Sequence, residues 1–191
     1  MKKIVLATGN KGKLEEFREM LPTFDVVSPK ELGVAFDVEE TGANFYENAL
    51  IKARALYDVC KMPTLADDSG LCVDALGGAP GIMSARYSGG TDVDNINKLL
   101  SELDGITNRS AHFACCIVYF DGRTVVEATG EAHGRIALAP EGNGGFGYDP
   151  IFISDDLNKT FAVASAREKN AVSHRARALA ALKSKLEGRA D

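Results

Sequence analysis

The chain has 191 residues, of which 45% are hydrophobic and 26% charged, so it is long enough for one globular domain with its own core. Its 27 acidic and 22 basic residues give a net charge of −5, which argues against a protein that binds nucleic acid through a basic face. No stretch approaches the roughly 20 apolar residues of a membrane span, so we expect no membrane contact.

The four cysteines are spaced in a way that argues against structural zinc, because none forms a CxxC pair. Buried free thiols in a reducing compartment are the simplest interpretation, so we expect a cytoplasmic protein. These residues are Cys60, Cys72, Cys115 and Cys116.

The first part of the chain predicts the alternation of strands and helices that is typical of an α/β protein with parallel pairing. An Ile/Val-rich run at residues 3–7 predicts a buried strand, and leucine and phenylalanine at helical spacing predict a helix over residues 11–21. Residues 24–27 predict a second strand. A long helix is expected over residues 44–61, capped by its first residue, and a short strand over residues 64–66.

The middle of the chain begins with a glycine-rich loop at residues 77–90 and continues with a helix over residues 92–103, capped by Thr91 or Asp92. Two long strands then follow, and an Asp-Gly hairpin signal joins them. We expect these strands over residues 111–120 and 124–136.

The last part of the chain predicts a third strand over residues 148–153 and a final helix over residues 173–186. Together the elements predict one domain over residues 1–191. We expect an α/β fold with a mixed central β-sheet flanked by helices and two lobes with a cleft between them.

A loop rich in glycine and lysine follows the first predicted strand and opens the first predicted helix. Amides at a helix N-terminus favour anions, and glycines let a phosphate come close. The spacing is not that of a P-loop. Phosphate binding and an ordinary turn with exposed lysines therefore both remain open. The residues are Thr8, Gly9, Asn10, Lys11, Gly12 and Lys13.

An acidic segment, Asp67-Asp68-Ser69-Gly70, follows the short strand expected at residues 64–66. Two adjacent carboxylates at the end of a strand cannot both be buried without a compensating cation. A divalent metal supplies such a cation, so that one carboxylate would hold the metal while another activates water. An acidic turn that ends the strand is the alternative.

More polar residues surround the start of the long helix. Glu39 and Glu40 precede it, and a solvated charge cluster is the favoured interpretation. Asn48 and Lys52 are four positions apart and therefore share one helix face, where a surface pair is the simple interpretation.

A second glycine-rich loop carries Phe146, Gly147, Tyr148 and Asp149. An aromatic ring beside a flexible backbone suits stacking on a flat base, although the loop is also compatible with a plain connection between strands.

Basic residues lie near the start of the last predicted helix, namely Lys169, His174 and Arg175. The donors of His174 and Arg175 suit the keto oxygen of a 6-keto purine and would face the amino group of adenine unpaired. A capped helix with exposed basic residues is the alternative.

These segments, in this order, resemble the inosine triphosphate pyrophosphatase family, the noncanonical purine NTP pyrophosphatases or dITP/XTP pyrophosphatases. The resemblance spans nearly the whole chain, and the DDSGL sequence is similar to that of the bacterial branch. The matching stretches are TGNKGK at 8–13, EETG at 39–42, ENALIKA at 47–53, ADDSGL at 66–71, GGAPGIMSARYSG at 77–89, GGFGYDPIF at 144–152 and SHR at 173–175.

The resemblance implies a mixed α/β fold with two lobes and a nucleotide-binding cleft between them. It implies an enzyme that hydrolyses ITP, dITP and XTP to the nucleoside monophosphate and pyrophosphate, with Mg²⁺ as cofactor, and so removes these nucleotides from the pool. It also implies a homodimer. A pyrophosphatase with another base preference and a nucleotide-binding module without catalysis are the alternatives.

The resemblance also implies roles for single residues. Asp68 would be the proton acceptor and a metal ligand, Glu40 a second ligand and Lys52 a catalytic or phosphate-binding lysine. Spacing does not choose between Glu39 and Glu40, and Asp67 has only a hypothetical place in the outer shell of the metal. The substrate would be bound by Thr8, Gly9, Asn10, Lys11, Gly12, Lys13, Ser69, Phe146, Gly147, Tyr148, Asp149, Lys169, His174 and Arg175.

Overall fold

The computed structural model describes residues 2–188 and divides into two compact units. Unit 1 consists of Met1–Asp68, Cys115–Gly130 and Arg175–Asp191, and unit 2 of Ser69–Ala114 and Glu131–His174. The strands are β1 (Lys2–Leu6), β2 (Phe24–Val27), β3 (Thr64–Val73), β4 (Ser110–Phe120), β5 (Val125–Ile136) and β6 (Phe152–Ser154). The helices are α1 (Lys11–Met20), α2 (Phe45–Cys60), α3 (Asp92–Glu102), α4 (Ala166–Val172) and α5 (His174–Glu187).

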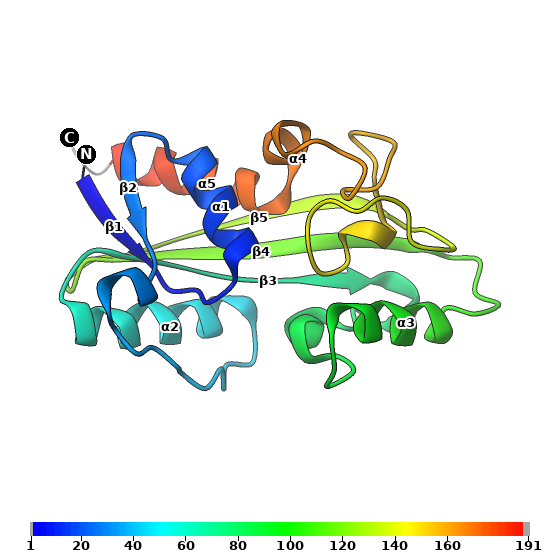
Figure 1. Ribbon diagram of the computed structural model, residues 1–191, viewed down its shortest axis with the longest axis horizontal. Helices are drawn as coiled ribbons and strands as arrows, with labels where there is room; N and C mark the ends of the chain where they lie inside the picture. Colours follow the sequence, from blue (N-terminus) through cyan, green and yellow to red (C-terminus); the bar gives the residue numbers. More distant parts are fainter. Residues whose placement is uncertain (1, 189–191) are drawn as a thin grey trace. The chain divides into compact units, whose positions relative to one another are not determined.

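The six strands form one sheet in the order β2-β1-β3-β4-β5-β6 (Figure 1). β1 pairs in parallel with β2 and with β3, whereas β5 pairs antiparallel with β6. The sheet is therefore mixed, and the predicted α/β fold with flanking helices is confirmed.

In unit 1, helices cover both faces of the sheet. Successive strand residues point to opposite faces, so Ile4 of β1 joins a core with Phe17 of α1 and Leu179 of α5. Val5 joins a separate core with Leu56 of α2. Figure 1 shows α2 on one side of these strands and α1 with α5 on the other. Burial on both faces explains the continuous apolar run Ile4-Val5-Leu6 in β1.

In unit 2, the core is rich in aromatic rings. The Phe113 ring of β4 lies 4.7 Å from the Phe152 ring of β6 and 6.0 Å from the Phe161 ring, centroid to centroid. Leu99 of α3 packs in the same core. Such ring pairs add about 0.5–1.5 kcal/mol each beyond the burial of their area.

Helix capping follows the predicted signals. The Asn44 side chain accepts a hydrogen bond of 2.9 Å from the Glu47 amide, as expected for the start of α2. Of the two candidates for α3, Thr91 is the cap, and it forms a capping box with Asp94.

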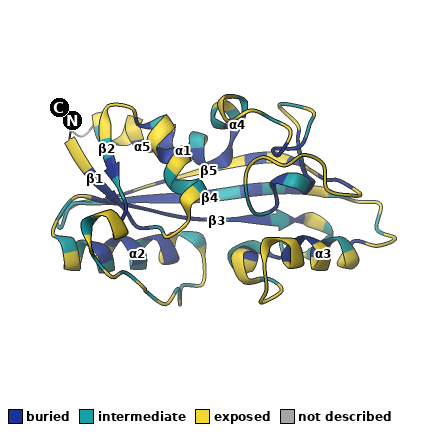
Figure 2. Ribbon diagram, viewed as in Figure 1, coloured by how far each residue is buried: buried dark blue, intermediate teal, exposed yellow. Residues whose placement is uncertain are grey.

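The strand predicted at residues 64–66 was too short, because β3 continues to Val73. Asp67 and Asp68 therefore lie inside the strand and not after its end. Figure 2 shows β3 as largely buried. The prediction ended early because carboxylates are normally excluded from buried strands, and the cations that offset them here come from distant segments.

Two predictions near the end of the chain were also wrong. The strand expected over residues 148–153 overlaps β6 only at its end, since Asp149–Ile151 forms a 3₁₀ turn in which the Ile151 amide donates to the Tyr148 carbonyl. Helix α4 was not predicted, although Ser165 and Glu168 form a capping box at its start. None of the helices within residues 2–188 has the length and apolar character needed to cross a membrane.

Candidate active site

Asp68 lies on the face of β3 that is covered by α2. Asn48 donates a hydrogen bond of 3.1 Å to its Oδ2, and the Lys52 ammonium lies 3.4 Å from its Oδ1. Asn48 and Lys52 are one helical turn apart, so both reach the same carboxylate. Asn48 is 0% and Lys52 8% exposed. The interpretation of these two residues as a surface pair was therefore wrong.

Glu40 lies beside the same lysine, with its Oε1 2.8 Å from the Lys52 Nζ. Glu39 is exposed, so the structure distinguishes the two glutamates by their surroundings. The Gly42 amide donates to the Asn48 side chain at 2.8 Å, and a Cβ at Gly42 would come within 2.6 Å of that oxygen. The glycine of the EETG segment is thus required by close packing against α2.

The electrostatics of this group favour a charged lysine and a basic carboxylate. Burial raises the pKa of Asp68 above its usual range, although Lys52 opposes the effect. Burial alone would lower the pKa of Lys52, but the carboxylates of Asp68, Asp67 and Glu40 outweigh it and raise the pKa. Lys52 therefore stays protonated at neutral pH.

Asp67 belongs to a second group of charges, formed with α1 and α5. Its Oδ2 lies 3.0 Å from the Lys13 ammonium and 3.0 Å from Nη2 of Arg175, whose Nη1 lies 2.5 Å from the Glu16 carboxylate. Burial alone would raise the pKa of Asp67, but Lys13 and Arg175 outweigh it and hold the pKa far below its usual range. Arg175 is 1% exposed, so the alternative of an exposed basic residue at this position was wrong.

The predicted phosphate loop lies between β1 and α1. Thr8 accepts a hydrogen bond of 3.1 Å from the Asn10 amide, and the Asn10 side chain caps α1 by accepting from the Lys13 amide at 3.1 Å. Gly9 and Lys11 are exposed, and Gly12 is half-buried. The strand–helix turn is present, and phosphate binding stays a prediction.

The predicted base-binding residues of unit 2 gather around a buried ion pair. The Lys169 ammonium lies 2.5 Å from the Asp149 carboxylate and 4.6 Å from the centre of the Phe146 ring. Asp149 also accepts a hydrogen bond of 2.9 Å from the Phe146 amide. His174 is buried and stacks on Phe113 at 4.7 Å with an interplanar angle of 14°.

Three further predicted residues of unit 2, Tyr148, Gly147 and Ser69, do not contact the Asp149–Lys169 ion pair in the hydrogen bonds described next. Tyr148 is buried and donates a hydrogen bond of 2.7 Å to the Ser84 carbonyl. The Gly147 amide donates to the Asp92 carboxylate at 2.9 Å. Ser69 is half-buried in β3. Their roles toward a substrate stay predictions.

Two residues of these charge groups were missed as site residues. Asn48 gave a sequence signal, because it lies one helical turn from Lys52. Glu16 lies three positions after Lys13 and therefore on the same side of α1, yet nothing in the sequence indicated its contact with Arg175.

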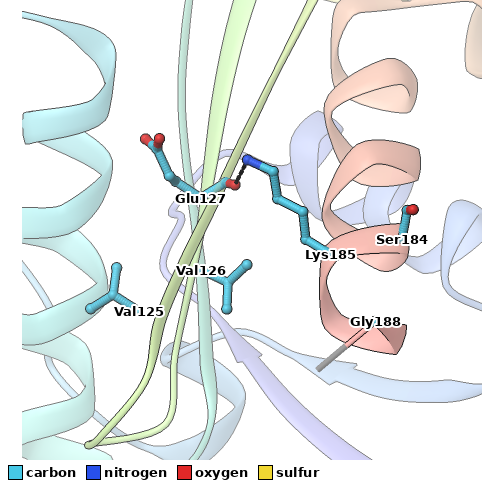
Figure 3. A pocket seen from close by; sticks show the side chains of 6 residues that line it. All are labelled: Val125, Val126, Glu127, Ser184, Lys185 and Gly188. Carbon is cyan, nitrogen blue, oxygen red and sulfur yellow. Dashed lines mark hydrogen bonds between the residues drawn. The ribbon is translucent and has the colours of Figure 1, made fainter. Parts of the chain in front are cut away.

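Three further observations concern groups of possible metal ligands, the cysteines and a pocket. Within residues 2–188, no three or more His, Cys, Asp or Glu side chains are grouped so that they could hold a metal ion by themselves. All four cysteines are free thiols. A pocket of about 540 Å³ in unit 1 contains none of the predicted site residues, and Figure 3 shows Lys185 of α5 donating to the Glu127 carbonyl there. Its lining residues are Val125, Val126, Glu127, Ser184, Lys185 and Gly188.

Fold and side chains together define an α/β protein with a mixed sheet and a largely buried group of two carboxylates, an amide and a lysine. The chain belongs to the Ham1 family, whose model matches residues 4–185.

Relatives over the full length support this assignment. A dITP/XTP pyrophosphatase of Treponema denticola is 52% identical over 192 residues, which cover 97% of this chain and 99% of the relative. A dITP/XTP pyrophosphatase of Erwinia tasmaniensis is 50% identical over 190 residues, covering 94% and 91%. The solved structure of the Staphylococcus aureus Ham1 protein has a TM-score of 0.87 at 43% identity, covering 98% of this chain and 100% of that one. The family resemblance read from the motifs is confirmed.

Proposed function

We propose that this chain is a nucleoside triphosphate pyrophosphatase that hydrolyses ITP, dITP and XTP to the nucleoside monophosphate and pyrophosphate. The names of its relatives, dITP/XTP pyrophosphatases, support this substrate class. The proposed role is the removal of noncanonical purine nucleotides from the nucleotide pool.

The observation that carries the proposal is that two carboxylates, those of Glu40 and Asp68, lie next to the ammonium of Lys52. Glu40 and Asp68 lie 2.8 and 3.4 Å from the Lys52 Nζ, within a largely buried group. A buried cation between carboxylates is an arrangement that suits the binding and cleavage of a highly charged anhydride.

The donor set fits Mg²⁺, which prefers carboxylate oxygens and is commonly held by one or two carboxylates together with substrate phosphates. Glu40 and Asp68 are the residues that would hold it, since their oxygens already converge on one cationic atom. When bound, Mg²⁺ supplies neutralisation of the triphosphate charge.

Side chains of unit 1 would activate the attacking water and stabilise the charge of the phosphates. Asp68, with its raised pKa, accepts a proton from water. The water oxygen forms a bond to the α-phosphorus while the bond from that phosphorus to the oxygen of the leaving pyrophosphate breaks. Asn48 orients the carboxylate, and Lys52 stabilises negative charge on the phosphates. General-base assistance contributes roughly 10²–10⁴-fold, so electrostatics must supply much of the rest.

Selection of the base is the finer part of the proposal. In unit 2, Phe146 offers a ring for stacking and His174 a donor to the keto group of hypoxanthine or xanthine. Lys169 and Arg175 are proposed as substrate-binding residues on the family resemblance. The loop from Thr8 to Lys13 is proposed for the phosphates. A homodimer and a cytoplasmic location complete the proposal and rest on the family resemblance and on the cysteine usage.

The experiment that tests the proposal is a pyrophosphate-release assay over ITP, dITP, XTP, GTP, ATP and dUTP, with and without Mg²⁺. We expect rapid release from the first three nucleotides and little from ATP or dUTP. We also expect Mg²⁺ to be required, with activity lost on addition of a chelator and restored by excess Mg²⁺.

The outcomes separate the alternatives. Fast turnover of ATP or dUTP with slow ITP would mean a pyrophosphatase with another base preference. Binding of ITP without release of pyrophosphate would mean a nucleotide-binding module. Asp25→Asn provides a matched control for an acidic substitution in unit 1, because the Asp25 side chain is 48% exposed and lies 3.7 Å from the Lys3 ammonium.

A further inference from the structure

Asp67 and Asp68 are neighbours in the sequence but lie on opposite faces of β3. Side chains alternate along a strand, so Asp67 shares its face with Leu65, which packs in the core with α1 and α5. Asp68 shares its face with Ala66, which packs in the core with α2. The two carboxylates therefore have separate sets of partners.

Asp67 is more deeply buried than its neighbour, with a side chain that is 0% exposed. A charged carboxylate in this position would be strongly unfavourable without cations close by. Its Oδ2 meets Lys13 at 3.0 Å and both Nη2 and Nε of Arg175, at 3.0 and 3.3 Å. One carboxylate oxygen thus joins two cations that come from distant parts of the chain.

Both cations belong to segments that the proposed function places on the substrate. Lys13 lies in the first turn of α1, directly after the loop at residues 8–10, and its side chain remains 16% exposed. Arg175 lies in the first turn of α5, and Glu16 holds its Nη1 at 2.5 Å. Without the charge of Asp67, Lys13 and Arg175 would repel each other across a buried space.

We propose that Asp67 is a positioning residue that holds Lys13 and Arg175 in one buried network, and that it is neither a metal ligand nor the base. This inference rests on the proposed function. On the face of β3 that packs against α1 and α5, Asp67 holds Lys13 and Arg175 in place. On the face that packs against α2, Glu40 and Asp68 hold the metal, and Asp68 accepts the proton.

A double-mutant cycle tests the proposal. The variants Asp67→Asn, Lys13→Met and the combination of both are compared for kcat and KM on ITP with Mg²⁺. We expect Asp67→Asn to lower kcat/KM by about tenfold or more. Because Asp67 acts through Lys13, we expect the double variant to be little worse than Lys13→Met alone. Fully additive losses would overturn the proposal.

The dependence on Mg²⁺ separates a positioning residue from a ligand. We expect Asp67→Asn to keep the wild-type Mg²⁺ concentration for half-maximal activity, whereas Glu40→Gln raises it. If Asp67→Asn raises it as much as Glu40→Gln does, Asp67 is a ligand and the proposal is wrong. Asp25→Asn is the matched control and should behave like the wild type in both assays.

Loss of one partner of a buried ion pair destabilises a fold strongly, so Asp67→Glu is the second variant. It keeps the charge but moves the oxygens by one methylene group. We expect it to fold and to raise KM for ITP. Wild-type kinetics in Asp67→Glu would contradict the need for a fixed position of this carboxylate.

A readout without nucleotide tests the geometry independently of the activity. Reductive methylation of the folded protein, mapped by mass spectrometry, reports how accessible each lysine is. We expect slow labelling of Lys13 in the wild type and faster labelling in Asp67→Glu, relative to Lys61, whose side chain is 66% exposed. Equal labelling of Lys13 in both proteins would overturn the proposal, whereas a wild type without pyrophosphatase activity would overturn only the proposed function.

Discussion

The two units bury charge in different ways. Unit 1 gathers charges of both signs on both faces of β3, and each buried carboxylate there meets at least one cation. Unit 2 sets the Asp149–Lys169 pair among aromatic rings, with the ammonium 4.6 Å from Phe146 and 5.6 Å from Phe161. The charged residues grouped around β3 in unit 1 are Lys13, Glu16, Glu40, Lys52, Asp67, Asp68 and Arg175.

The comparison shows two ways in which one chain keeps charged side chains in its interior. The side chains of a buried network stay ionised because attraction between several opposite charges offsets the free energy of desolvation. Such a network suits phosphates and a divalent ion. A single ion pair between rings keeps a flat apolar surface beside a few directed donors, which suits a base. The following predictions test this division, from the largest expected effect to the smallest.

Asp68→Asn should have the largest effect on activity. The amide keeps the shape of the side chain but cannot accept the proton from water, so we expect kcat/KM for ITP to fall by about 10²–10⁴-fold. The melting temperature should stay close to that of the wild type. Unchanged pyrophosphate release would show that Asp68 is not the base.

Lys169→Met should have the largest effect on the stability of unit 2. It leaves the carboxylate of Asp149, which is 2% exposed, without the ammonium beside it. We expect a loss of about 3–5 kcal/mol in the free energy of unfolding, measured in urea.

The matched control for Lys169→Met is Lys159→Met. The Lys159–Glu168 pair has a similar distance of 2.7 Å, but its side chains are 34% and 43% exposed. Its loss should lower the free energy of unfolding far less than Lys169→Met does, because exposed ion pairs contribute little. An equal decrease in the free energy of unfolding in the two variants would mean that the burial of the Asp149–Lys169 pair does not increase its contribution to stability.

Asn48→Ala should weaken both activity and fold in unit 1. It removes the donor to Asp68 and the acceptor for the Gly42 amide, so we expect a loss of about 1–3 kcal/mol in stability. We also expect kcat/KM to fall by about tenfold, because the carboxylate of Asp68 loses its orientation.

Asn44→Ala provides the control on the same helix. It removes the cap of α2 at a cost of about 0.5–2 kcal/mol but touches no charge of the site. It should leave kcat/KM of the folded protein unchanged. A similar loss of activity in both variants would mean that Asn48 acts only through the fold.

The exposed pair Arg18–Glu31 should have the smallest effect. Hydrogen bonds from Arg18 and Ser28 lower the pKa of Glu31 from 4.5 to about 2. The folded protein therefore takes up this proton at lower pH than the unfolded chain, so the stabilisation is present above about pH 4.5 and is lost as the pH falls towards 2.

Glu31→Gln should accordingly lower the free energy of unfolding by no more than about 1 kcal/mol at neutral pH, because both side chains are largely exposed. The difference from the wild type should shrink in urea unfolding at pH 3. A difference that grows at acid pH would contradict the assigned contacts.

Much of the fold was predictable from local signals. Leu14, Phe17 and Leu21 at helical spacing predicted α1, and the Asp-Gly turn predicted the β4–β5 hairpin, where the Asp121 side chain accepts from the amides of Arg123 and Thr124. The short helix α4 and the 3₁₀ turn at Asp149–Ile151 were missed, because seven and three residues carry too little periodicity.

The candidate site was predictable as a set of residues but not as an arrangement. The motifs named Asp68, Lys52 and Glu40, and these lie together in the structure. Arg175 was expected to face a substrate, and its contacts with Asp67 and Glu16 span more than 100 positions of the chain. Contacts between residues so far apart in the sequence cannot be predicted from the spacing of residues within one segment.

Helix spacing, caps, turn residues and ordered motifs sufficed to assign the family and to name most of the charged groups. The separation of Asp67 from Asp68 came only from the fold. In the sequence the two adjacent carboxylates form one acidic segment, yet the pleat of a strand points them to opposite faces. Which cations then meet each carboxylate depends on the helices that pack there, α1 and α5 for Asp67 and α2 for Asp68.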